Sequence, residues 1–199
     1  RTYATIRCKD VMCAEELCSI KKYGYREDAM KITPESAAKA YEELLRTARV
    51  EIMFEGCGDP TLAKDIFAQK FADVKREPIE LSRSLVKAQQ GAVKEETERM
   101  EVKQGKLVMG FRVEGIEDYR RMNMARITFA LFGGTANSLL FKNVREKMSL
   151  CYYCSSGYDR SNSIMMVSSG VEAENAQKAR DEVLHQLEML KNGEFTDRE

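Results

Sequence analysis

Two cysteines three residues apart, Cys151 and Cys154, are the first candidates for chemistry in this chain. A Cys-x-x-Cys pair can bind zinc or exchange a disulfide. Structural zinc normally needs four cysteine or histidine ligands, and the other four of the six cysteines form no second pair of this kind. Both residues fall in a predicted strand, where side chains three apart point to opposite faces. We therefore expect one thiol buried as an apolar group and one packed against a helix, without a joint metal or redox role.

The segment from His185 to Met189 contains His-x-x-Glu but no second histidine. A zinc peptidase of the inverzincin type needs His-x-x-Glu-His, in which two imidazoles bind the metal and the carboxylate activates water. His185 is the only histidine and falls off the apolar stripe of its predicted helix, on the solvent side. The sequence contains neither a nucleophile–histidine system nor a phosphate-binding glycine pattern. We expect no catalytic residue, metal or other cofactor in this chain itself.

Arg145 and Tyr152 form a third candidate site, with seven residues between a predicted helix end and the strand after it. A guanidinium offers a planar fork of donors for carbonyl or carboxylate oxygens, and a tyrosine adds a ring and a hydroxyl. Together they could hold a peptide main chain along a sheet edge. The alternative is structural: an arginine that interacts with the helix dipole, and a core tyrosine. The residues alone leave both interpretations open.

The composition is that of a globular protein without a charge bias. The 199 residues carry 32 basic and 32 acidic side chains, so the totals favour neither nucleic acid nor an anionic membrane as a partner. No apolar run approaches the roughly 20 residues that span a bilayer. The first ten residues are polar and charged, unlike a signal peptide. With no export signal and few cysteines, we expect free thiols and a cytoplasmic location.

The elements that would position Arg145 and Tyr152 follow from caps and hydrophobic periodicity. Thr33-Pro34-Glu35 and Asp59-Pro60 each predict a helix start, and Gly133-Gly134 predicts a helix end. Predicted helices cover 34–48, a segment from 60, 119–132, 138–148 and 175–191. Predicted strands cover 49–56, two segments of 96–113 around a Gln104-Gly105 turn, 150–158 and 163–171.

This order of elements predicts an α+β fold, with helices packed on a largely antiparallel sheet of about five strands. We expect residues 1–33 to be a helical lead-in from a preceding domain, and residues 34–199 to be a single α+β domain. The last four residues, Thr196 to Glu199, match a capping box that announces a helix. We therefore expect the chain to be a fragment of a longer protein.

The segment from Leu131 to Tyr153 resembles the second domain of a half-molecule in the insulinase/pitrilysin and mitochondrial processing peptidase family. The resemblance follows the order of short motifs, which are Gly133-Gly134, Ser138, Leu140-Phe141, Val144-Arg145-Glu146-Lys147 and Leu150-Cys151-Tyr152. The segments Lys106–Val113 and Lys31–Pro60 also look like parts of that domain. The resemblance covers roughly residues 24–199.

The resemblance implies a zinc metallopeptidase half-domain, in which two halves close around a chamber. Zinc would sit on His-x-x-Glu-His in another domain, in the same chain or a separate subunit, and the partners would be that zinc-bearing half and a peptide substrate. Arg145 and Tyr152 match the arginine and tyrosine that hold substrate near the zinc. Gly133 and Gly134 resemble a substrate-contacting loop, although the turn here is short.

We therefore expect a substrate-binding domain without zinc, of the bacterial non-catalytic partner type, working as a dimer of halves that cleaves peptides. Two alternatives stay open within the same family. One is a non-proteolytic scaffold, and the other is a peptide-binding maturation factor that retains the Arg145 and Tyr152 contacts without cleavage.

Overall fold

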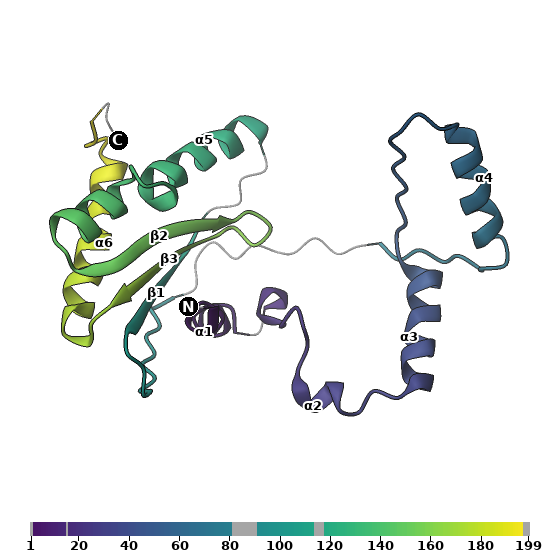
Figure 1. Ribbon diagram of the computed structural model, residues 1–199, viewed down its shortest axis with the longest axis horizontal. Coiled ribbons are helices and arrows are strands. Elements are labelled where there is room, and N and C mark those ends of the chain that lie inside the picture. The colour runs from purple at the N-terminus through teal and green to yellow at the C-terminus, as the bar shows by residue number, and fades with distance from the viewer. Residues whose placement is uncertain (1, 15, 81–90, 114–117, 197–199) are drawn as a thin grey trace. The chain divides into compact units, whose positions relative to one another are not determined.

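The computed structural model describes residues 2–14, 16–80, 91–113 and 118–196 (Figure 1). Its contacts divide the chain into two compact units. We call Arg1–Ile20 together with Ser84–Glu199 the sheet unit, and Lys21–Arg83 the helical unit. The expected division at residue 33 stays a prediction, although contacts group the first helix with the sheet. The expected capping box ends at residues 197–199, outside the described residues.

The sheet unit is built on three antiparallel strands in the order β1-β3-β2. These are β1 (Gly105–Arg112), β2 (Cys151–Asp159) and β3 (Ile164–Val171), and the last two form the predicted hairpin. Leu107 of β1 lies opposite Ser169, and Tyr158 of β2 lies opposite Met165. The α+β fold with an antiparallel sheet is confirmed, but the sheet formed by the described residues has three strands instead of about five.

Strand β2 contains a bulge at Tyr152. Cys151 pairs with Val171, whereas Tyr153 already pairs with Gly170, so Tyr152 is the extra residue. Cys154 pairs with Ser169, which faces the same side of the sheet as Val171. Cys151 and Cys154 therefore share one face, and the expectation that they point to opposite faces is wrong because the bulge shifts the alternation.

The helices after β1 cover one face of this sheet (Figure 1). They are α5 (Tyr119–Phe129), η2 (Ala130–Gly134), η3 (Leu140–Lys147), η4 (Ala173–Asn175) and α6 (Ala176–Lys191). The fully buried core side chains between helices and sheet include Phe132, Leu140, Val144, Val167 and Val183. The predicted helices 119–132, 138–148 and 175–191 are confirmed, with η2 and η3 wound as π-helices.

The first helix, α1 (Thr2–Met12), packs against the opposite face of β1. A Cβ on Gly110 would lie 2.5 Å from the Sδ atom of Met12, so a glycine is what allows this close approach. After α1, the short helix η1 (Leu17–Ser19) follows Glu16, whose carboxylate is ion-paired with Arg112 of β1.

The helical unit contains α2 (Arg26–Ala29), α3 (Pro34–Thr47) and α4 (Pro60–Phe71). The Thr33 hydroxyl accepts a hydrogen bond from the backbone N–H of Ser36, and the Asp59 carboxylate accepts one from the N–H of Thr61. Both helix starts were predicted from these caps.

Two predicted strands are not strands in this structure. Residues 49–56 form no ladder, and their alternating apolar side chains, Val50, Ile52 and Phe54, are 45%, 50% and 48% exposed. The other is the segment before the Gln104-Gly105 turn, where residues 96–102 carry no regular structure. There, Glu96 and Glu98 bind the guanidinium of Arg7 instead. None of the helices in the described ranges combines the length and low polarity that crossing a bilayer requires.

Candidate functional site

Arg145 lies in the last turn of η3, as predicted, and points toward the start of β2. Its Nε donates a hydrogen bond to the main-chain carbonyl oxygen of Tyr152 at 3.0 Å. Its guanidinium stacks over the ring of Phe141, 4.5 Å from the ring centroid, and Nη1 lies 3.9 Å from a carboxylate oxygen of Glu146. The side chain remains 40% exposed. An arginine has five N–H donors, so this hydrogen bond leaves four for a ligand.

Tyr152 is the bulged residue of β2 and is 60% exposed, so it is not a core tyrosine. Its hydroxyl donates a hydrogen bond to a carboxylate oxygen of Glu172 at 3.1 Å. That hydrogen bond and the negative charge of Glu172 raise the pKa of the Tyr152 phenol above its usual value. The hydroxyl therefore stays protonated at neutral pH and can donate to an acceptor. Bulges often redirect a side chain beside a functional site.

The turn between η3 and β2 brings Arg145 and Tyr152 together. Ser149 takes a left-handed conformation with φ of 51°, and the N–H of Leu150 donates to the carbonyl of Val144. Leu150 is buried, which fixes the turn against the core. The arginine contacts the strand carbonyl of Tyr152, so the two residues form one exposed donor site at the start of β2.

Gly133 and Gly134 differ in their surroundings. Gly133 is buried, and a Cβ there would lie 2.6 Å from the backbone nitrogen of Ser156 and 2.8 Å from Leu140. Gly134 is exposed and lines a cavity described below. The substrate contacts expected of both glycines stay predictions.

Cys151 and Cys154 both belong to the buried core cluster, together with Val144 of η3 and Val183 of α6. A hydrogen bond with Cys154 lowers the pKa of the Cys151 thiol to about 7 despite burial. The same hydrogen bond, together with burial, raises the pKa of the Cys154 thiol. Both thiols are buried in the core on the same face of the sheet. The expected arrangement, with one thiol in the core and the other on a separate side against a helix, is not the one observed.

A second group of possible ligands lies in the sheet unit at Cys13, Glu16 and Cys18, whose ligand atoms lie within 4.8 Å of one another. Burial, with hydrogen bonding to Cys18, raises the pKa of the Cys13 thiol to about 12. The carboxylate of Glu16 is already bound by Arg112, whose positive charge opposes a cation. We assign no metal to these residues.

His185 is exposed on α6, as expected, and Glu188 forms an ion pair with Lys191 at 2.6 Å. The His-x-x-Glu pair therefore consists of surface residues, and the sequence contains no second histidine to complete a zinc motif.

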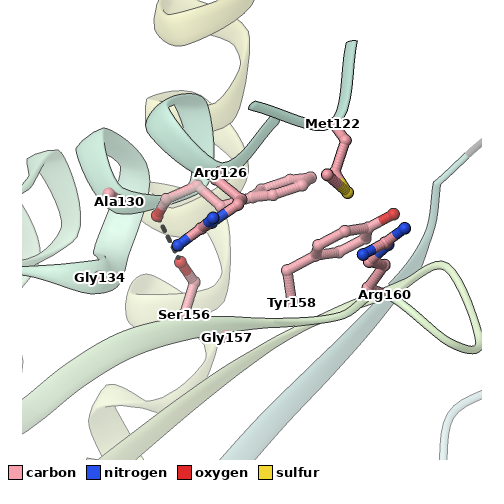
Figure 2. A pocket seen from close by; sticks show the side chains of 9 residues that line it. Met122, Arg126, Ala130, Gly134, Ser156, Gly157, Tyr158 and Arg160 are labelled. Carbon is pink, nitrogen blue, oxygen red and sulfur yellow. Dashed lines mark hydrogen bonds between the residues drawn. The ribbon is translucent and has the colours of Figure 1, made fainter. Parts of the chain in front are cut away.

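A cavity of about 440 Å³ opens between α5, η2 and the far end of β2 (Figure 2). Two arginines line it, Arg126 from α5 and Arg160 just after β2. Phe129 and Tyr158 stack at its side with ring centroids 4.5 Å apart, and the Ser156 hydroxyl donates to the carbonyl of Phe129. This cavity could not be predicted from the sequence, because nothing in the local pattern links residues so far apart in the chain.

The chain belongs to the family described as the peptidase M16 inactive domain, whose model matches residues 31–199. This result confirms the resemblance to the insulinase/pitrilysin and processing peptidase family, and its non-catalytic type.

The chain is also similar to individual proteins. Over 99% of its length the chain is 29% identical to a Bacillus subtilis protein named "probable inactive metalloprotease YmfF", and it covers 46% of that protein. A conserved protein of Enterococcus faecalis has a similar structure, with a TM-score of 0.87 and 25% identity over 98% of this chain and 46% of its own.

Another similar structure is that of a peptidase M16 inactive domain from Pseudomonas fluorescens. It has a TM-score of 0.70 and 20% identity over 96% of this chain and 46% of its own, which supports the fold alone. The chain thus spans about half the length of the relatives that it matches.

Proposed function

We propose that this domain holds peptide for a zinc endopeptidase assembly and that Arg145 and Tyr152 make the main contacts. The supporting observation is their joint placement. Arg145 donates to the Tyr152 carbonyl, and both side chains remain exposed at the start of β2.

Arg145 and Tyr152 would bind the peptide through hydrogen bonds to its main chain. The free N–H groups of Arg145 would donate to substrate carbonyls or to the oxyanion of a tetrahedral intermediate. The hydroxyl of Tyr152 would donate a hydrogen bond to the same substrate group, after giving up its hydrogen bond to Glu172. The family's zinc would polarise the scissile carbonyl, but this chain has one histidine and cannot hold that ion as the family does.

The partner in this proposal is a zinc-bearing peptidase half, in the same chain or a separate subunit, with a peptide as the substrate. We place the assembly in the cytoplasm, because the thiols of the described cysteines are free.

A non-proteolytic role is the second candidate. The observation that favours it is the name of the Bacillus subtilis relative, which describes that protein as a probable inactive metalloprotease. A scaffold would use the fold without the Arg145 and Tyr152 contacts, whereas a maturation factor would bind peptide without cleaving it.

The zinc content of the complete natural protein, purified alone, tests whether the zinc is held by a separate partner. We expect well under one zinc per chain, no peptide cleavage alone, and cleavage once a zinc-bearing partner is added. About one zinc per chain would place the His-x-x-Glu-His motif in the rest of the protein, so that it would be a peptidase by itself. No cleavage with any zinc-bearing partner, at unchanged peptide affinity, would favour the maturation factor.

A further inference from the structure

The cavity beside α5 is lined by two cationic side chains, Arg126 and Arg160. Within the described part of the chain, their guanidinium groups form no ion pair or side-chain hydrogen bond, and none of the described residues that line the cavity is acidic. Figure 2 shows Arg126 nearer Ser156 and Arg160 nearer the hydroxyl end of Tyr158. The two positive groups thus approach one cavity from α5 and from the end of β2.

The hydroxyl of Tyr158, at the side of the cavity, is a hydrogen-bond donor without an acceptor in the described structure. The hydroxyl oxygen of Tyr158 is buried and has no hydrogen-bond partner in the described structure. A buried polar group without a partner is unfavourable, so an acceptor would gain this hydrogen bond once side chains lining the cavity move to uncover the hydroxyl. The stacked rings of Phe129 and Tyr158 provide apolar surface next to the same place.

We propose that this cavity binds a carboxylate group of a peptide, through Arg126 and Arg160 with the Tyr158 hydroxyl as an additional donor. The inference rests on the proposed function for the nature of the ligand, and it adds a second anchor to the same strand. Arginine forks match a carboxylate in geometry, and the aromatic side receives the apolar part of a residue.

A peptide carboxylate fits better than a nucleic acid. The chain carries 32 basic and 32 acidic residues, without the excess of positive charge that follows a phosphate backbone. A cavity of about 440 Å³ accepts one or two residues, whereas a phosphate chain needs an extended groove. The carboxylate could come from an acidic side chain or from the C-terminus of the peptide.

The test uses the complete natural protein and three fluorescent peptides of equal length. The first has glutamates and an amidated C-terminus, the second is neutral with a free C-terminus, and the third is neutral and amidated. We expect the first or the second to bind more tightly than the third, which identifies the source of the carboxylate. Arg126→Gln and Arg160→Gln should each weaken that peptide about tenfold and leave the third peptide unchanged.

Arg121→Gln is the matched control, because it removes an equal charge from exposed α5 surface outside the cavity. Tyr158→Phe should weaken whichever of the first two peptides binds more tightly, without lowering the stability of the free protein, since the lost hydroxyl has no partner in the described structure. Equal affinity for all three peptides, or equal losses in Arg121→Gln and Arg126→Gln, would overturn the proposal. Displacement of the bound peptide by inorganic phosphate at the concentration of an ordinary buffer would also overturn the proposal.

The Arg145→Ala variant separates this inference from the proposed function. If the cavity is an anchor of its own, that variant keeps the ratio of affinities between the tighter of the first two peptides and the third. If no peptide binds at all, the proposed function fails. If the third peptide binds as tightly as the first and second, only the cavity assignment fails.

Discussion

Arg145→Ala should lower peptide cleavage by the complete zinc-bearing assembly about 100-fold, with the fold of the domain intact. The expected loss is large because the guanidinium would donate both to the bound peptide and to the oxyanion that develops in the transition state. The structural consequence is small, since the side chain is 40% exposed and its hydrogen bond to the Tyr152 carbonyl lies at the surface. The measurement is kcat/KM on a fluorogenic peptide, together with circular dichroism.

Two companion variants sharpen this result. Arg145→Lys keeps the charge but loses the planar fork, so we expect it to recover only part of the activity. Lys147→Ala removes a cation from the same exposed turn of η3 and should leave cleavage unchanged. Equal activity in Arg145→Ala and the natural protein would remove Arg145 from the site.

Gly133→Ala should destabilise the domain by about 3 kcal/mol, the upper part of the range for overpacking a core. A methyl group there would lie 2.6 Å from the backbone nitrogen of Ser156 and 2.8 Å from Leu140, and a strand backbone has little freedom to retreat. The same shift would move Ser156 at the edge of the cavity beside α5. Urea unfolding of the complete protein measures the change.

Gly157→Ala is the control for this prediction. It lies in the same strand, and a Cβ there meets nothing within 4 Å. We expect a change within about 0.5 kcal/mol, as for other open surface positions. If Gly133→Ala were as stable as Gly157→Ala, the close contact between η2 and β2 would not exist in solution.

The helices could be predicted from the sequence because their signals are local. Thr33 and Asp59 cap α3 and α4 with hydrogen bonds to residues two or three positions away. The stripe of α6 likewise needs no partner to be recognised, and Ala179 and Val183 are fully buried as that stripe predicts.

The missing strands show the limit of periodicity. Alternation of Val50, Ile52 and Phe54 says only that the segment fits a half-buried pleated surface. A strand also needs a neighbouring strand to pair with, and the described residues of the helical unit contain none. The strand count was therefore too high although the fold class was right.

The donor site was predicted in its residues but not in its geometry. The spacing of Arg145 and Tyr152 and the turn between them follow from the sequence, whereas the bulge that exposes Tyr152 does not. One extra residue reversed the alternation and also brought Cys151 and Cys154 together. The cavity at Arg126 and Arg160 depends on how α5 meets β2, and no local pattern carries that information.

Peptide affinity tests the account most directly. We would measure the Kd of a neutral amidated peptide for the complete protein and for Arg145→Ala, Tyr152→Phe and the double variant. The account predicts about tenfold weaker binding in each single variant, and a double variant weaker by less than the product, because the two residues share one hydrogen-bonded site. Affinities within about twofold of the natural protein in all three variants would contradict a peptide-holding role for this domain.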